Sequence, residues 1–146
     1  ELVKFRSMLP EIGPDGRIRP VNERVTRLGR FLRRTSLDEL PELWNVLKGE
    51  MSIVGPRPLI HDYLPLYSKQ QMQRFDVRPG ITGWAQVNGR NALSFTDRFA
   101  HDVWYVQNRS LWLDFRIMLK TIGDAFAGKG VYVDDTTTMA KFDGKN

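Results

Sequence analysis

Apolar positions recur with helical spacing in several stretches of this chain. In one of them Leu40, Leu43, Trp44 and Leu47 stand at positions i, i+3, i+4 and i+7, as on one face of an amphipathic helix. Another stretch has the same pattern interrupted near Pro65. The spacing predicts helices over residues 22–34, 36–47, 95–107 and 111–126, and an interrupted helix over residues 60–77.

Shorter stretches have the patterns of strands and turns. Residues 2–8 ("LVKFRSM") alternate as a short strand does, and residues 10–20 ("PEIGPDGRIRP") have the Pro and Asp-Gly content of a loop or hairpin. Residues 51–59 ("MSIVGPRPL") predict an extended piece that runs into a rigid turn. Residues 84–87 ("WAQV") predict a short β piece between glycine breaks.

These patterns together predict an α+β, helix-rich fold. We expect a compact single domain, residues 1–146, with about four to five helices, short β-hairpin pieces and Gly/Pro loops. Some of the helices are expected to be amphipathic and interfacial. The polar tail, residues 131–146, is expected to be loosely attached.

The composition is that of a folded soluble chain and restricts the metal chemistry. The 146 residues are 41% hydrophobic and 27% charged. There is no cysteine and there are two histidines, so disulfides and thiolate zinc sites are excluded, and any metal would be a hard, oxygen-bound cation. No apolar run reaches the roughly eighteen residues that a membrane span needs.

The formal net charge of +5 favours anionic partners such as phosphates, nucleic acid or an acidic membrane surface. Arg27, Arg30, Arg33 and Arg34 recur every three to four residues, so a helix would place them roughly on one side. Such a stripe can be a solvated surface face. It can also grip phosphates, because arginine binds phosphate oxygens in pairs.

Two adjacent carboxylates follow this stripe in "TSLDELPELWNVLKG". Ser36 and Glu39 fit a capping box, and Pro41 fits a helix start, so the local pattern favours a helix cap. However, Asp38 and Glu39 would differ by about 100° around a helix axis and could have different roles. One could be a nucleophile or metal ligand and the other a base or orienting group.

Several arginines stand on stiff turns. Arg57 lies between two prolines in "GPRPL", and Arg78 and Arg90 adjoin glycine breaks in "RPGITG" and "VNGR". A structural turn explains the prolines but not the arginine, so these positions suggest preorganised anion binding. The last two helices also carry aromatic residues, including Trp104 and Trp112, which suit either core packing or an interfacial membrane helix.

Four blocks together resemble the bacterial sugar transferase family. They are "KFRSM", "RTSLDELPELWNVLKGEMSIVGPRPL", "RPGITGWAQVNGR" and "TTTMAKFDGKN", and they stand in the family's order over essentially the whole chain. The family comprises monotopic polyprenyl-phosphate phosphoglycosyltransferases. The short chain and its tail look most like the small, catalytic-domain-only members that initiate N-linked glycan assembly.

The resemblance implies a reaction and a set of site residues. A sugar-1-phosphate would pass from a UDP-sugar to undecaprenyl phosphate, releasing UMP, by a ping-pong route through a covalent aspartyl-phosphosugar and with Mg²⁺ as cofactor. Asp38 would be the nucleophile and Glu39 its partner, both near the metal. The residues that would bind phosphate oxygens are Arg57, with Arg33, Arg90 and Lys4 as weaker candidates.

The resemblance also implies partners and a location. We expect a UDP-sugar, N-acetylated or amino-modified, a membrane surface on the cytoplasmic face of the bacterial inner membrane, and no nucleic acid. Family members have a hydrophobic re-entrant helix before the "KFRSM" block, so we expect this sequence to be a soluble or peripheral piece of a membrane enzyme. Two alternatives are a non-catalytic basic module that binds anionic lipid or nucleic acid, and a transferase of another class that forms no adduct on Asp38.

Overall fold

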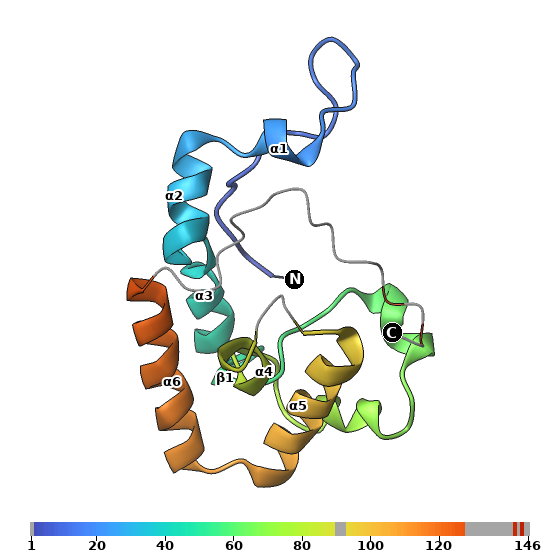
Figure 1. Cartoon of the computed structure of the whole chain (residues 1–146), viewed down its shortest axis with the longest axis vertical. Coiled ribbons are helices and arrows are strands. Elements are labelled where there is room, and N and C mark those ends of the chain that lie inside the picture. The colour runs from blue at the N-terminus through green and yellow to red at the C-terminus, as the bar shows by residue number, and fades with distance from the viewer. Residues whose placement is uncertain (1, 90–92, 128–141, 143, 145–146) are drawn as a thin grey trace.

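Helices surround a short two-stranded sheet in the computed structural model of the chain (Figure 1), which describes residues 2–89, 93–127, 142 and 144. The described α-helices are α1 (Val21–Arg24), α2 (Arg27–Thr35), α3 (Glu42–Leu47), α4 (Trp84–Val87), α5 (Phe95–Asn108) and α6 (Leu111–Phe126). The 3₁₀ helices are η1 (Leu37–Glu39), η2 (His61–Leu66) and η3 (Gln71–Phe75), and the strands are β1 (Ser52–Val54) and β2 (Gly80–Thr82). The predicted helix-rich α+β class is confirmed.

The two strands pair in parallel, with Ser52 opposite Gly80 and Val54 opposite Thr82. The extended piece predicted within residues 51–59 is confirmed as β1, whereas the sequence patterns predicted neither β2 nor this parallel pairing. A parallel pair needs a long crossover, and residues 55–79 supply it with η2 and η3. A hairpin-like contact does occur earlier in the chain, where Ile12 and Ile18 form an isolated antiparallel bridge.

Two predicted strands are absent from the described structure. "WAQV" forms the short helix α4, in which Ala85 and Val87 are buried and the Val87 N–H donates to the Gly83 carbonyl at 3.2 Å. The segment 2–8 contributes only a single bridge, from Met8 to Val25. In both cases packing against neighbouring segments overrides the local pattern.

The first predicted helices are broken, whereas the last two are confirmed. Residues 22–34 divide into α1 and α2 because the Thr26 side chain caps α2, accepting from the Gly29 N–H at 2.8 Å. Residues 36–47 begin as a 3₁₀ turn before α3, and residues 60–77 form only 3₁₀ turns. Helices α5 and α6 match the predictions to within a residue.

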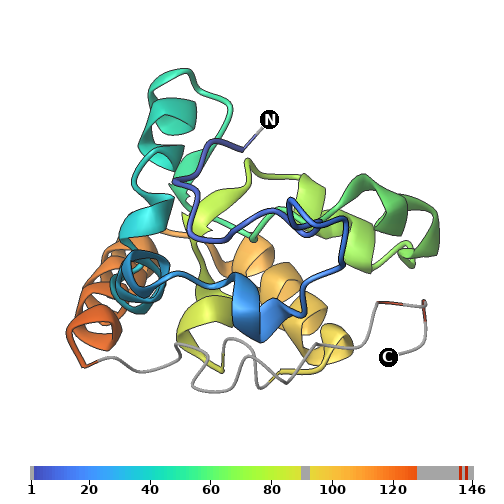
Figure 2. The same cartoon turned by 90° about the horizontal axis from the view of Figure 1, so that it is seen from above.

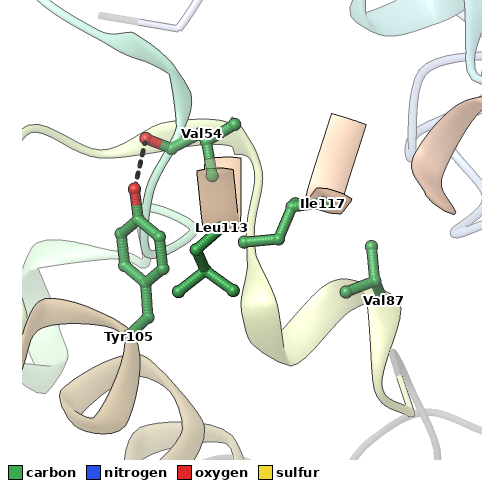
Figure 3. Close-up of a cluster of buried hydrophobic side chains, with 5 residues drawn as sticks. All are labelled: Val54, Val87, Tyr105, Leu113 and Ile117. Carbon is green, nitrogen blue, oxygen red and sulfur yellow. Dashed lines mark hydrogen bonds between the residues drawn. The ribbon is translucent and has the colours of Figure 1, made fainter. Parts of the chain in front are cut away.

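One buried cluster lies between β1, α4, α5 and α6 (Figure 3) and consists of Val54, Val87, Tyr105, Leu113 and Ile117. The Tyr105 hydroxyl donates to Asp114 Oδ1 at 2.7 Å and lies 3.4 Å from the Val54 carbonyl oxygen. Burial, together with the Asp114 carboxylate, raises the pKa of Tyr105, so this hydroxyl stays protonated. The cluster fixes β1 against the two long helices.

A second cluster brings the end of the chain back to the domain. Phe142, which is 4% exposed, packs with Phe95 and Phe99 of α5, its ring centroid lying 5.4 Å and 5.0 Å from theirs. Tyr63 and Tyr67 complete the cluster. The expected loose attachment of the tail was therefore wrong at Phe142, while residues 128–141, 143, 145 and 146 lie outside the described residues.

Three glycines bring the turn after β1 against the backbone of β2 and the residues beside it. A Cβ atom on Gly55 would lie 2.4 Å from the Arg78 carbonyl oxygen, and one on Gly80 would lie 2.1 Å from the Gly55 nitrogen. A Cβ on Gly83 would lie 2.2 Å from the Gly55 carbonyl oxygen. Only glycine permits this approach. The close contact fixes the turn that follows β1, and this turn carries Arg57.

Helices α2, α3 and α6 lie on one side of the molecule, and α5 lies on the other side of the sheet (Figures 1 and 2). Among residues 2–89 and 93–127, no helix combines the length and the apolar character that crossing a bilayer requires.

We expect Phe142→Ala to lower the free energy of unfolding by about 3 kcal/mol, because it leaves a cavity among aromatic rings. Phe126→Ala is the matched control, since the same truncation at a side chain that is 90% exposed should change stability by less than about 0.5 kcal/mol. Denaturant unfolding measures both. Equal losses in the two variants would contradict the buried position of Phe142.

Candidate functional site

A cluster of charged side chains forms where the amino-terminal segment, η1 and the turn after β1 meet. Lys4 Nζ lies 3.1 Å from Glu39 Oε1, and the Arg57 guanidinium donates to the same oxygen. All three side chains are partly buried. Residues that are 35 and 18 positions from Glu39 in the sequence thus meet on one carboxylate.

The amino-terminal segment reaches the site because it lies along α2 and η1. The Phe5 N–H donates to the Asp38 carbonyl at 3.0 Å. Further along, a Cβ atom on Gly29 would lie 1.8 Å from the Ser7 carbonyl oxygen, so only glycine lets the segment approach α2 this closely. These two contacts place Lys4 beside Glu39.

The predicted capping box is not formed. Ser36 adopts the left-handed conformation, with φ 56° and ψ 18°, and it ends α2 by donating its N–H to the Arg33 carbonyl. Its side chain makes no capping bond. The chain reverses at Ser36, so Glu39 lies in a short 3₁₀ turn where its carboxylate binds Arg57 and Lys4 instead of a backbone amide.

Asp38 and Glu39 point in different directions from this turn. A 3₁₀ helix separates neighbouring side chains by about 120°, so the two carboxylates have different surroundings. Within the part of the chain that the structure describes, the half-buried Asp38 carboxylate makes no hydrogen bond or ion pair, whereas Glu39 binds two cations. Glu39 thus holds Lys4 and Arg57 beside the turn, and the predicted role of Asp38 as the nucleophile stays a prediction.

The charges of the cluster stabilise one another. Burial alone would raise the pKa of Glu39, but the hydrogen bond and charge of Arg57, followed by Lys4, outweigh it and lower that pKa below 4.5. Burial alone would lower the pKa of Arg57, but Glu39, Glu42 and Asp38 outweigh it and raise that pKa. Both ionised forms are therefore favoured, so Arg57 keeps its positive charge beside an ionised Glu39.

Arg57 is also fixed through its backbone. Its flanking prolines restrict the turn, its guanidinium donates to the Ile81 carbonyl at 3.4 Å, and its own carbonyl accepts from Arg74 at 2.6 Å. Arg57 follows a bend at Gly55, and its predicted role in preorganised anion binding stays a prediction. The partner Arg74 was not predicted.

Glu42 is a further carboxylate of the site that the sequence did not indicate. It is 2% exposed, and its Oε1 atom lies 3.0 Å from Lys4 Nζ. The angles of this contact fall outside hydrogen-bond geometry, so we interpret it as an ion pair by distance. Lys4 thus lies between Glu39 and Glu42. The sequence feature that could have indicated Glu42 is its spacing, because it is a glutamate three residues after Glu39, in the first turn of α3.

The other arginines that the sequence analysis named do not join the cluster of Lys4, Glu39 and Arg57 in the described contacts. Arg27, Arg30 and Arg34 are exposed on α2, which fits a solvated face, and Arg33 is half-buried in the last turn of α2. The phosphate-binding role of Arg33 stays a prediction. Arg90 lies outside the described residues.

A groove of about 760 Å³ lies away from these residues. Its lining includes Ser52, Arg78, Tyr105, Arg109 and Asp114, and none of Lys4, Asp38, Glu39 and Arg57. The groove is near the starts of the two strands, whereas Arg57 follows the end of β1. We place the candidate site at the charged cluster because the structure brings the predicted residues Lys4, Glu39 and Arg57 together there, next to Asp38 in the chain.

The carboxylates suit a magnesium ion that substrate helps to bind. Among the described residues, no three His, Asp or Glu side chains are grouped to hold a metal ion by themselves. Mg²⁺ commonly binds one or two carboxylates together with substrate phosphates and water. Asp38 and Glu39 carry hard oxygen donors of this kind, and a magnesium site at these two residues stays a prediction.

We expect the Glu39 ion pairs to stabilise the fold only while Glu39 is ionised. Because its pKa is lowered on folding, the contribution is present above its unfolded pKa, near 4.5, and is lost as the pH falls through the folded value. Glu39→Gln should therefore be less stable than the parent protein near neutral pH, and the difference should shrink below roughly pH 4.

Denaturant unfolding at a series of pH values measures this difference. Glu11→Gln, which removes a more exposed carboxylate 4.0 Å from Arg24, is the control and should show little pH-dependent difference. A difference for Glu39→Gln that stays constant down to pH 3 would contradict the lowered pKa.

Comparisons with known proteins agree on one family. The family description "Bacterial sugar transferase" matches residues 1–128. An uncharacterised sugar transferase, EpsL, of Bacillus subtilis is 49% identical over 143 residues, which are 98% of this chain and 71% of that protein.

Two further relatives are longer proteins. The undecaprenyl-phosphate galactose phosphotransferase of Salmonella typhimurium is 48% identical over 109 residues, 75% of this chain and 23% of that protein. The UDP-glucose:undecaprenyl-phosphate glucose-1-phosphate transferase of Xanthomonas campestris is 44% identical over 142 residues, 90% of this chain and 29% of that protein. This chain thus spans under a third of these two.

Proposed function

Since this chain belongs to the bacterial sugar transferase family, we propose that it transfers a sugar-1-phosphate from a UDP-sugar to undecaprenyl phosphate and releases UMP. The observation that carries the proposal is the cluster in which Arg57 and Lys4 meet on Glu39, next to the Asp38 carboxylate, for which the described residues provide no hydrogen bond or ion pair. Family membership favours this enzyme over the alternative of a non-catalytic basic module.

In the first step an Asp38 carboxylate oxygen attacks the phosphorus that bears the sugar. The bond from that phosphorus to the bridging oxygen breaks, UMP leaves with the bond's electron pair, and the phosphosugar stays on Asp38. In the second step a phosphate oxygen of undecaprenyl phosphate attacks the same phosphorus, and the Asp38 carboxylate is released. Such a double displacement lets one site serve a soluble donor and a lipid acceptor in turn, with ping-pong kinetics.

The neighbouring groups oppose the negative charge of the diphosphate. Arg57 stands on a fixed turn, so its donors need not reorganise as charge develops on the transferred phosphoryl group. Lys4 adds a second cation, and Glu39 orients both of them. Mg²⁺, held by Asp38 and Glu39, would supply further charge neutralisation on the phosphate oxygens.

The relatives do not indicate one sugar, because their names specify galactose in one case and glucose in another. The expected N-acetylated or amino-modified sugar stays a prediction. A screen of UDP-sugars for UMP release would identify the donor.

We expect Asp38→Ala to lower the rate of UMP release at least ~10³-fold, because the nucleophile is removed. In the parent protein, incubation with the donor should add the mass of one phosphosugar, and the adduct should map to Asp38. Asp15→Ala, at an exposed loop position, is the control and should keep both turnover and adduct. Normal turnover by Asp38→Ala would contradict the proposal, and turnover without an adduct would indicate a transferase of another class.

The apolar face of α6 supports the proposed contact with a membrane surface. Its exposed residues follow one side of the helix, while Leu113 and Ile117 on the other side are buried in the core. Such a face, ending in aromatic residues, suits the boundary between headgroups and acyl chains. The face consists of Trp112, Phe115, Leu119, Ile122 and Phe126.

Helix α3 has exposed apolar residues of its own, Leu43, Trp44 and Leu47. Lys48 lies over the Trp44 ring, with its Nζ atom 5.6 Å from the ring centroid. An aromatic residue with a cation beside it is typical of side chains at the headgroup level.

We expect the double variant Trp112→Ser, Phe126→Ser to bind vesicles of phosphatidylethanolamine and phosphatidylglycerol about tenfold more weakly, since two apolar side chains no longer leave water. The control is Ile12→Ser, Ile18→Ser, which removes two exposed apolar side chains from the hairpin-like loop. Vesicle flotation measures both. Equal binding by the two double variants would contradict the placement of the membrane-facing surface.

A further inference from the structure

Arg74 is a charged residue buried inside the domain, 3% exposed, and no motif of the sequence indicated it. Its Nε and NH2 atoms donate to Asp102 Oδ2 of α5 at 3.2 Å and 2.9 Å. Its NH1 atom donates to the Tyr67 hydroxyl at 3.2 Å. Asp102 is equally inaccessible, at 2% exposed.

The same guanidinium also reaches the candidate site. Its NH2 atom donates to the backbone carbonyl of Arg57 at 2.6 Å. This is a charge-assisted bond to the backbone of the residue whose side chain binds Glu39. A continuous series of contacts therefore runs from Asp102 through Arg74 and Arg57 to Glu39.

Packing alone does not account for Arg74. A buried guanidinium has a large desolvation cost, and an apolar side chain of similar volume would fill the space without it. The guanidinium instead provides donors in a fixed planar fork, which here face three acceptors on three segments. The rings of Tyr67, Phe75 and Phe99 lie 5.3–5.6 Å from its central carbon and restrict its orientation.

We propose that Arg74, anchored by Asp102, is a positioning residue that sets the turn carrying Arg57, and thereby sets where the Arg57 guanidinium meets the donor's phosphates. The inference rests on the proposed function and extends it. The backbone of the turn already pairs with β2, where the Gly80 N–H donates to the Pro56 carbonyl at 3.0 Å. Asp102 belongs to the long helix α5, which is packed in the core, so Arg74 connects the turn to a second rigid element.

The principal test is a double-mutant cycle on kcat/KM for the UDP-sugar. Lysine keeps the charge of Arg74 but cannot bind Asp102 and the Arg57 carbonyl with one planar fork. We expect Arg74→Lys to lower kcat/KM at least tenfold in the parent protein. In an Arg57→Ala background it should lower kcat/KM less than about twofold, because the group it positions is gone.

The control for a purely structural effect is Tyr105→Phe. This variant removes the contacts of another hydroxyl on α5, with Asp114 and with the Val54 carbonyl, and neither contact involves Arg57 or Arg74. It should have the same effect on kcat/KM in both backgrounds. If Arg74→Lys also gave the same fold-change in both backgrounds, the proposal would be overturned.

A milder variant covers the case in which Arg74→Lys does not fold. Tyr67→Phe removes one acceptor of Arg74 and keeps the aromatic ring, so the fold should survive. It should lower kcat/KM about threefold in the parent protein and not in the Arg57→Ala background. Equal changes in the two backgrounds would again overturn the proposal.

A second measurement needs no turnover, so it separates this inference from the proposed function. Phenylglyoxal modifies accessible arginines, and peptide mass spectrometry gives the modification rate at Arg57 alone. We expect this rate to rise severalfold in Arg74→Lys or Tyr67→Phe and to stay unchanged in Tyr105→Phe. If no UDP-sugar gave UMP, the proposed function would fail, while a raised rate at Arg57 would still support the positioning role and an unchanged rate would overturn it.

Discussion

The close backbone contact between the turn after β1 and strand β2 is the constraint on which the rest of the structure depends. Gly55, Gly80 and Gly83 allow it, because a Cβ atom at any of them would overlap the neighbouring backbone. The two strands are parallel, so the chain between them must cross over. That crossover carries both Arg57 and Arg74, and the helices that pack beside the sheet complete the site around them.

Ion pairs and charged hydrogen bonds then connect the amino-terminal segment, η1, the turn after β1 and helix α5. Glu39 on η1 attracts Lys4 from the amino-terminal segment and Arg57 from the turn, while Arg74 connects that turn to α5. Partly buried ion pairs of this kind are specific in geometry, since each unpaired member would carry a desolvation cost. The arrangement leaves Asp38 without such a partner in the described part of the chain, which is consistent with the nucleophilic role proposed for it.

The apolar residues of the amphipathic helices are buried in some places and exposed in others. The side of α6 that carries Leu113 and Ile117 is in the core, whereas the side that carries Trp112 and Phe126 is exposed. On α2 the buried position is Gly29, which meets the amino-terminal segment, and the large residues Leu28 and Phe31 are exposed. A periodic pattern indicates that an apolar face exists, but it does not indicate what covers that face.

The sequence by itself determined the helix-rich class, helices α5 and α6, the extended piece before "GPRP" and the stiff placement of Arg57, because these depend on local periodicity and on proline geometry. It also indicated Asp38, Glu39, Lys4 and Arg57 as site residues through the family resemblance. The tertiary structure alone decided that "WAQV" is helical, that Ser36 ends a helix instead of capping one, and that Glu42, Arg74 and Phe142 are buried. For Arg74 and Phe142 the physical reason is distance along the chain, because their partners on α5 are far away in the sequence and no local pattern contains such contacts. For Ser36 the reason is its left-handed backbone conformation, which its residue type did not indicate.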